Sequence, residues 1–431
     1  MDLNNVKFSW LDGYPKNWEK KRVKYVFYLS KSNVVSLKEY PILSLTMKGI
    51  KLRDVSTNEG QLPENYDGYT LLEKDDIVFN PMDLISGWVD KSNVQGLISP
   101  SYKVLRTKKE NSNRDYFKYF FQTHYTEKIF FPFGEGVHYQ YRWGLGSQTL
   151  LNFPLLVPPY KEQNQIVQFL DEKTELIDKL ISTKEQKITL LKEQKNSLIN
   201  EVVTKGLNTN VKMKDSGVEW IGEIPINWNM YRVSNFGRFF KGSGIKKDEV
   251  KPEGIPCIRY GEIYTKYERV VYNPLSFIDI ETSKNSIQIQ KGDILFTGSG
   301  ETIDDIGKSL LYYGDRNIFV GGDIIVLRPK EGISVLYLSY LMNTSFIKHQ
   351  KSLMGRGEII VHIYSKNIKE IKTPLPSMEE QLQIVEYLDL KTKEIDDLVE
   401  LEQKKIHLLK EYRKSLISEV VFGKIKVTTD E

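Results

Sequence analysis

The sequence predicts an α+β protein in which two globular mixed α/β domains are separated by two long helices that form an antiparallel coiled coil. Three observations lead to this expectation. A long helical segment occurs twice, apolar residues in both copies recur every seven positions, and the regions before each copy are rich in short strand-like runs. With 431 residues, the chain is also too long for one ordinary hydrophobic core.

The composition is that of a globular protein without a disulfide framework. Hydrophobic residues make up 40% and charged residues 27%, and the net charge is only +4. No run of about 18 apolar residues is present, and the opening MDLNNVKFSW lacks a signal-peptide pattern. The single cysteine, Cys257, excludes an internal disulfide, and the five histidines have no metal-ligand spacing. We therefore expect a reducing, cytoplasmic setting, no membrane segment and no metal site.

The chain repeats its own plan. EQNQIVQFLDEKTELIDKL (Glu162–Leu180) matches EQLQIVEYLDLKTKEIDDL (Glu380–Leu398), and LLKEQKNSLINEVV matches LLKEYRKSLISEVV, all at an offset of 218 residues. An earlier repeat pairs WLDGYPKNW (Trp10–Trp18) with WIGEIPINW (Trp220–Trp228). A weaker one pairs KDDIVFN with KGDILFT (Lys291–Thr297). Two halves with one plan but dissimilar middles suggest one task performed on two different objects.

Both repeated segments are predicted to be coiled-coil helices. Neither contains Pro or Gly over five heptads, and at 1.5 Å per residue about 44 residues form a rod of roughly 65 Å. Pro158 and Pro159 precede the first helix, while Ser377 and Glu380 fit a capping box at the start of the second. The predicted seam consists of Leu170, Ile177, Lys184, Leu191, Leu198, Leu388, Ile395, Glu402, Leu409 and Leu416.

An antiparallel pairing of the two helices brings their middles together. There Lys184 and Glu402 occupy equivalent seam positions with opposite charges. We hypothesise that they form a polar layer that sets the register of the helices. The alternative is that both side chains reach out to solvent.

The domain boundaries follow from these repeats. Residues 1–157 form the first domain, 158–205 the first helix, 206–219 a polar linker, 220–375 the second domain, 376–425 the second helix and 426–431 a tail. Strand-like runs such as DIVFN and DIIVLRP, broken by Gly, Pro and Asn, predict mixed α/β domains with many loops. One helical stretch is expected over Tyr337–His349.

Several motifs resemble those of a known family, the specificity subunits of Type I restriction–modification systems. The pattern PxxxEQxxIVxxL precedes each helix (Pro158–Leu170 and Pro376–Leu388), and SLIxEVV lies near each helix end. The segment VKMKDSGVEWIGEIPINW between the halves is also typical, as are IPCIRYGEI, TGSGETIDDIGK, NPMD and GLISPSYKVLR within the domains. The resemblance covers nearly the whole chain, and the order and duplication of the motifs make it specific.

The resemblance implies a function. In that family each variable domain is a target recognition domain that reads one half of a split double-stranded DNA sequence, and the two helices set the distance between the half-sites. The expected partners are double-stranded DNA, two methylation subunits, and restriction/translocase subunits. No cofactor is expected on this chain, whereas S-adenosylmethionine, ATP and Mg²⁺ are expected on the partner subunits.

Base reading requires polar or basic side chains on loops that reach the grooves of DNA. Glycine-flanked loops with a basic neighbour also suit close approach to phosphate. The candidate DNA-binding residues are Lys48, Trp88, Lys91, Asn93, Gln140 and Arg142 in the first domain, and Lys241, Ser243, Arg259, Ser299 and Arg356 in the second. The alternative for each is an ordinary surface or turn residue.

Two other functional classes remain to be weighed. VPPY (Val157–Tyr160) is similar to a loop of amino-methyltransferases, but the side chain of Val157 cannot accept a hydrogen bond, and the cofactor glycine motif is missing. No Walker motif and no paired carboxylates for a nuclease are found, so we expect a non-catalytic chain. The alternative function is a coiled-coil scaffold with two protein-interaction domains, which steeply salt-dependent DNA binding would exclude.

Overall fold

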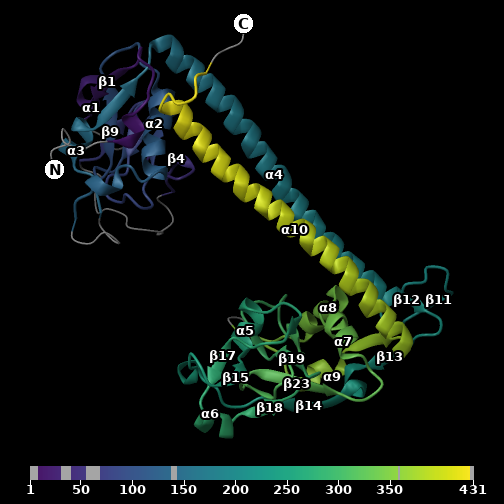
Figure 1. Cartoon of the computed structure of the whole chain (residues 1–431). Coiled ribbons are helices and arrows are strands. Elements are labelled where there is room, and N and C mark those ends of the chain that lie inside the picture. Colours follow the sequence, from purple (N-terminus) through teal and green to yellow (C-terminus); the bar gives the residue numbers. More distant parts are fainter. Residues whose placement is uncertain (1–7, 31–39, 55–67, 137–142, 358–359, 428–431) are drawn as a thin grey trace. The chain divides into compact units, whose positions relative to one another are not determined.

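The computed structural model describes residues 8–30, 40–54, 68–136, 143–357 and 360–427 (Figure 1). The chain divides into two compact units. The first comprises residues 1–185 and 404–431, and the second comprises residues 186–403. Each unit therefore combines one globular domain with part of each long helix.

The first domain is built on a four-stranded antiparallel sheet of order β2-β9-β6-β7. Three two-stranded pairs accompany it: β1 with β10, β3 with β4, and β5 with β8. Helix α2 begins where Asn113 accepts hydrogen bonds from the amides of Asp115 and Tyr116. The elements are β1 (Glu19–Arg22), α1 (Val23–Val26), β2 (Phe27–Leu29), β3 (Leu43–Thr46), β4 (Gly49–Leu52), β5 (Thr70–Leu72), β6 (Ile77–Phe79), β7 (Val89–Lys91), β8 (Gly96–Ile98), β9 (Lys103–Thr107), α2 (Arg114–Thr126), α3 (Ser147–Asn152) and β10 (Pro154–Val157).

The second domain contains a five-stranded sheet of order β14-β23-β19-β21-β16 and a four-stranded sheet of order β17-β15-β22-β18. The pairs β15–β22 and β16–β21 are parallel, and the other pairs within these two sheets are antiparallel. The elements are β11 (Met213–Asp215), β12 (Glu223–Pro225), β13 (Asn229–Arg232), β14 (Gly237–Lys241), β15 (Ile255–Ile258), α5 (Tyr260–Thr265), β16 (Val270–Val271), β17 (Ser276–Ile278), α6 (Ile280–Lys284), β18 (Ile287–Ile289), β19 (Ile294–Thr297), β20 (Ser299–Gly300), β21 (Ser309–Tyr312), β22 (Ile318–Val320), β23 (Ile324–Pro329), α7 (Val335–Leu341), α8 (Ser345–Met354), β24 (Val361–His362), α9 (Ser365–Glu370) and β25 (Lys372–Leu375).

The long helices are α4 (Tyr160–Lys205) and α10 (Met378–Val421). Within each unit they run antiparallel, because Arg413 pairs with Asp178 in the first unit and Lys195 with Asp396 in the second. Of the predicted seam residues, six are buried and the other four are half-buried. The buried six are Leu170, Ile177, Leu388, Ile395, Glu402 and Leu416, and the half-buried four are Lys184, Leu191, Leu198 and Leu409.

The polar position in the second helix is buried, as the heptads indicate, and one of its partners lies about one turn from Lys184. Glu402 is 2% exposed and accepts a hydrogen bond from Lys187 at 2.9 Å. A buried carboxylate needs such a partner, and the long lysine stem lets a flanking position supply it. The register role that we hypothesise for Lys184 stays a prediction.

The repeated sequence motifs form repeated contacts. Trp18 donates its indole hydrogen bond to Glu162 at 2.9 Å, and Trp228 donates to Glu380 at 2.8 Å. The adjacent glutamines accept an amide hydrogen bond from a domain residue at 2.9 Å in both halves. The tryptophan and EQ motifs therefore join each domain to the first turns of its helix.

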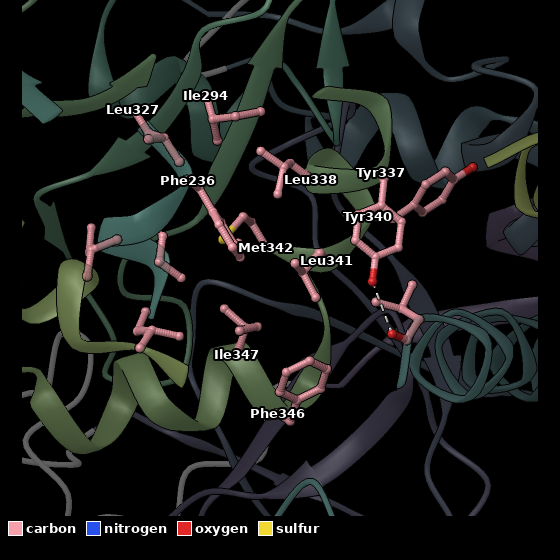
Figure 2. Packing of buried hydrophobic residues seen from close by; sticks show 14 of the residues in the cluster. Phe236, Ile294, Leu327, Tyr337, Leu338, Tyr340, Leu341, Met342, Phe346 and Ile347 are labelled. Atoms are coloured by element: carbon pink, nitrogen blue, oxygen red, sulfur yellow. Dashed lines mark hydrogen bonds between the residues drawn. The ribbon is translucent and has the colours of Figure 1, made fainter. Parts of the chain in front are cut away.

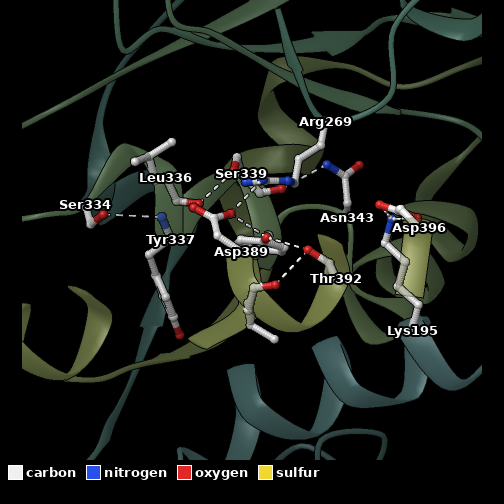
Figure 3. A network of polar contacts seen from close by, with 12 residues as sticks. Lys195, Arg269, Ser334, Leu336, Tyr337, Ser339, Asn343, Asp389, Thr392 and Asp396 are labelled. Carbon is white, nitrogen blue, oxygen red and sulfur yellow. Dashed lines mark hydrogen bonds and ion pairs between the residues drawn. The ribbon is translucent and has the colours of Figure 1, made fainter. Parts of the chain in front are cut away.

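A second repeated contact lies further along each helix. The Tyr119 hydroxyl donates to Asp171 at 2.6 Å in the first unit, and the Tyr340 hydroxyl donates to Asp389 at 2.6 Å in the second. Figure 3 shows the second of these sites. There Arg269 also donates to Asp389 at 3.0 Å and lies 3.7 Å from the centre of the Tyr340 ring. This network holds the second domain to α10.

The core of the second domain packs helices α7 and α8 against the five-stranded sheet (Figure 2). Ile294 and Leu327 come from the sheet, and Leu338, Leu341 and Ile347 come from the helices. All five are fully buried. Because burial of such side chains contributes about 1.5–3 kcal/mol each, this layer provides a rigid base for the surface loops of the domain.

The first domain has an aromatic core in which the end of the chain takes part. The rings of Trp10 and Phe422 stack with centroids 5.0 Å apart, and Phe120 packs edge-on against both. Phe153 lies nearly parallel to Trp10, with centroids 6.5 Å apart. His124 lies among these rings, fully buried. Burial lowers the pKa of His124 to about 3, so this imidazole is neutral in the folded protein at neutral pH.

The buried histidine predicts acid sensitivity of the first domain. The unfolded state binds a proton at His124 below pH 6.5, whereas the folded state binds it only near pH 3. Stability is therefore complete above about pH 6.5 and falls with decreasing pH, by about 2 kcal/mol between pH 6.5 and 5. Urea unfolding at the two pH values measures the loss. His124→Leu should flatten the dependence, and an unchanged dependence in this variant would contradict the assignment.

Two details differ from the sequence expectations. Residues 206–219 are not only a linker, because Met213–Asp215 pairs with Glu223–Pro225 as a short hairpin; the polar DSG turn allows this pairing. The helical stretch over Tyr337–His349 is two helices, since α7 ends at Leu341 and α8 begins at Ser345.

Candidate nucleic-acid interface

A basic hollow lies on the surface of the second domain. It has a volume of about 520 Å³ and lies between the loop after β14, the start of α5 and the turn between β22 and β23. Four cationic side chains line it, against the carboxylates of Glu262 and Asp323. The four are Lys246, Lys247, Arg259 and Lys266. The net positive charge suits an anionic ligand.

Glu262 orients two of these cations. It is 3% exposed and accepts hydrogen bonds from Ser276, from the amide and guanidinium of Arg259, and from Lys266. Burial acts to raise the pKa of Glu262. The hydrogen bonds from Ser276 and Arg259, with the charge of Lys266, outweigh that effect and hold the pKa below its ordinary value. Glu262 is therefore ionised and fixes Arg259 at the rim.

One hydrogen-bond donor of the Arg259 guanidinium has no partner among the described residues. Within the described part of the chain, its buried Nε has no hydrogen-bond partner. A buried donor without a partner is costly and is usually explained by a missing ligand or water. A guanidinium held in this way can donate to phosphate oxygens or to the O6 and N7 acceptors of guanine.

The loop after β14 is held in a strained shape beside the hollow. Gly244 has φ of +68° and Ile245 has φ of +55°, which a β-branched residue rarely adopts. A Cβ at Gly242 would lie 2.1 Å from the carbonyl oxygen of Gly321, so only glycine allows this close approach. The fold thus places Lys246 and Lys247 at the hollow at the expense of local strain.

Arg356 and Ser299 belong to a second group of predicted residues in this domain. The short strands β20 and β24 pair there, and Ser299 lies 3.0 Å from Nδ1 of His362. Ser299 is 4% exposed, so its side chain positions His362 rather than facing solvent. Arg356 exchanges two backbone hydrogen bonds with His362, and its side chain is exposed. Of the two predicted residues, Arg356 is therefore the one placed to meet a ligand.

The two remaining candidates in the second domain, Lys241 and Ser243, differ in what their side chains contact. Lys241 is exposed at the end of β14, next to the loop that borders the hollow. The Ser243 hydroxyl donates to the carbonyl of Asn285 at 2.8 Å and so serves the loop itself.

In the first domain, the structure separates Lys91 from the other candidates. Its ammonium group lies 2.9 Å from Asp115 and 3.1 Å from Asp75, and the side chain is only 15% exposed. Because two carboxylates neutralise it, Lys91 links β7 to helix α2 and is poorly placed to contact DNA. Its geometry favours the structural alternative.

The remaining first-domain candidates lie on turns. Lys48 is exposed at the tip of the β3–β4 hairpin, Asn93 is exposed in the turn after β7, and Trp88 is half-buried directly before β7. Gln140 and Arg142 lie outside the described residues. The predicted DNA-binding roles of Lys48, Trp88 and Asn93 stay predictions.

Sequence reasoning missed several residues of the hollow. Lys246 and Lys247 follow the glycine-rich KGSG after a single residue, Ile245, so a signal for them was present. Tyr260 and Lys266 gave no signal, because only the formation of α5, in which Lys266 bonds back to Glu262, brings them to the hollow.

The groups that line the hollow are suited to binding an anion. Among the described residues, no group of three or more His, Cys, Asp or Glu side chains is placed to hold a metal ion. Likewise, none of the helices that the structure describes is both long and apolar enough to span a membrane. The hollow offers cations, amides and an aromatic ring, which are the groups that contact nucleic acids.

Comparison with known proteins gives the family. The model described as "Type I restriction modification DNA specificity domain" matches twice, over residues 15–190 and 225–414. The type I restriction enzyme MjaVIII specificity subunit of Methanocaldococcus jannaschii is 25% identical over 287 residues, which are 64% of this chain and 63% of that protein. The EcoKI specificity subunit of Escherichia coli (strain K12) is 25% identical over 209 residues, 47% of this chain and 44% of that protein. The chain thus spans less than two thirds of the length of these relatives.

Two solved structures share the fold. A chain from a structure of a type I R-M system has a TM-score of 0.73 at 14% identity, covering 96% of this chain and 99% of that one. The HsdS subunit from Thermoanaerobacter tengcongensis has a TM-score of 0.55 at 15% identity, covering 96% and 98%. Together with a family model that covers most of the sequence in two copies, these likenesses establish that the chain belongs to the type I restriction–modification DNA specificity family.

Proposed function

We propose that this chain is the DNA-reading subunit of a type I restriction–modification complex, in which each domain recognises one half of a split double-stranded target. One observation carries the proposal: both halves join domain to helix through the same contacts, yet the described parts of the two domains are built differently. The tryptophan–glutamate and tyrosine–aspartate pairs recur, whereas the sheets of the two domains differ in strand number and order. A repeated framework with dissimilar readers suits a bipartite, asymmetric sequence.

The proposal includes the partners. Two methylation subunits would dock on the chain, and restriction/translocase subunits would complete the complex in the cytoplasm. S-adenosylmethionine, ATP and Mg²⁺ would act on those partners, and this chain would perform no chemistry. Support comes from the family of the chain and from the binding character of the hollow.

Methylome sequencing tests this function directly. A host would express the cognate methylation subunit with and without this chain. A split adenine-methylated motif that appears only with the chain would support the proposal and name the target. A stable complex with an active methylation subunit but no new motif would instead favour the protein-interaction scaffold.

The hollow gives a sharper prediction. Arg259→Gln should weaken target binding by about tenfold or more, since a guanidinium contact to a base contributes about 1–3 kcal/mol. Competition with duplexes altered in one half-site measures the effect, which should be confined to one half. Lys330→Gln, an exposed lysine outside the hollow, is the matched control. Equal weakening against both half-sites would make Arg259 a general phosphate contact rather than a base reader.

A further inference from the structure

A second cleft in unit 186–403 lies between the second domain and the long helices. Its volume is about 710 Å³, which is in the range of small-molecule sites. Its walls are formed by α4, α10, α5, the loop before β21, and the turn that leads into α8. This cleft is separate from the hollow around Arg259, since the two share no lining residue.

The cleft carries an excess of positive charge. Five cationic side chains line it, against the carboxylates of Glu268, Asp305 and Asp396. Two of the cations are neutralised, because Lys195 pairs with Asp396 and Arg269 pairs with Asp389. The other three are Lys308, Lys348 and Lys351. Among the described residues, these three form no ion pair with a carboxylate within 4.0 Å.

Lys351 is the unusual member of this group. It is 1% exposed, and its ammonium group donates to the carbonyls of Gly307 at 2.6 Å and Met342 at 2.9 Å. Burial, and then the charge of Lys348, lower the pKa of Lys351 to about 7. Burial is the largest effect on the pKa of Lys308 and lowers it, the charges of Asp305 and Glu268 act to raise it, and the charge of Lys348 acts to lower it. Lys348 is thus close enough to repel both Lys308 and Lys351.

Glu268 and Asp305 offset part of this repulsion, and an anion bound in the cleft would reduce the rest. The beginning of α8 adds to the attraction, because Thr344 and Ser345 line the cleft at the helix N-terminus, where the helix dipole favours negative charge. Tyr264 and Tyr272 supply aromatic wall, and Asn196 and Asn343 supply amides. These groups together match a phosphate with an attached polar or aromatic moiety.

We propose that this cleft binds a phosphate group through Lys308, Lys348 and Lys351. The phosphate comes either from a free nucleotide-like molecule or from the backbone of the bound DNA. Only the second source rests on the proposed function.

Binding of inorganic pyrophosphate to the full chain, measured by calorimetry at constant ionic strength, tests the site. Lys348→Gln is the informative variant, because this exposed residue can be changed without disturbing the core, and Lys330→Gln is the control. Saturable binding is expected to weaken about tenfold in Lys348→Gln, as for loss of one charge-assisted hydrogen bond, and to persist in Lys330→Gln.

DNA binding by the same variants distinguishes the two sources. If the backbone fills the cleft, Lys348→Gln should weaken binding to all duplexes equally and reduce the salt slope by about one. An unchanged slope with weakened pyrophosphate binding assigns the cleft to a free ligand. The proposal is overturned if Lys348→Gln and Lys330→Gln have the same affinity for pyrophosphate and the same salt dependence of DNA binding. The pyrophosphate result stands whether or not the chain reads DNA.

Discussion

Replacing Arg328 by Met is expected to destabilise the second domain by about 3 kcal/mol, because it leaves a buried carboxylate without its partner. Asp293 is 1% exposed and receives two hydrogen bonds from the Arg328 guanidinium, at 2.8 and 2.7 Å. It also accepts from the amide of Gln290 at 2.9 Å, which holds the turn that enters β19. Loss of the guanidinium therefore affects both the charge balance and the start of a central strand.

The first domain contains an equivalent arginine–aspartate pair, which provides a matched variant. Arg106 donates to Asp76 at 2.8 and 2.7 Å, and Asp76 accepts from the amide of Glu73 at 2.9 Å. Arg106→Met should therefore cost the first domain a similar amount. Because each change acts on one domain, each is expected to impair recognition of a different half-site.

Urea unfolding of each domain, followed with domain-specific probes, measures these losses. Lys284→Met is the control, since Lys284 and Glu281 form an exposed ion pair whose loss should cost less than about 0.5 kcal/mol. An effect of Arg328→Met as small as that of the control would contradict the view that Asp293 depends on this partner.

This ion pair also shows what the sequence could and could not reveal. The repeat of KDDIVFN with KGDILFT marks the two aspartates, Asp76 and Asp293. Their arginine partners lie some 30 residues later, on strands whose pairing only the fold supplies. Sequence reasoning therefore found the repeated strand but had no means of finding its partner.

The long helices were predictable because heptad periodicity is local. Every seam position is buried or half-buried, and α4 and α10 start within a few residues of the predicted positions. The DNA-binding residues were less predictable, because a lysine or arginine side chain can bind either a ligand or a neighbouring carboxylate. Lys91 and Arg259 looked alike in sequence, yet two carboxylates hold Lys91, whereas Arg259 retains an unpartnered Nε among the described residues.

Replacing Phe422 by Ala is expected to destabilise the first domain by about 3–5 kcal/mol, the usual effect of removing a buried aromatic ring. Phe422 is 2% exposed, stacks on Trp10 and packs edge-on against Phe120. The preceding carbonyl, that of Val421, accepts a hydrogen bond from the buried hydroxyl of Tyr116 at 3.2 Å. A cavity at this place would thus loosen both the aromatic core and the junction with α10.

Thermal or urea unfolding of the full chain checks this prediction, with Ile425→Ala as control because Ile425 is 37% exposed on the same segment. The control should change stability by less than about 0.5 kcal/mol. Loss of the unfolding transition of the first domain, with that of the second domain intact, would mean that the first domain needs Phe422 to complete its core. An unaltered first transition would show that Trp10, Phe120 and Phe153 suffice, and that the C-terminal segment only rests on a finished domain.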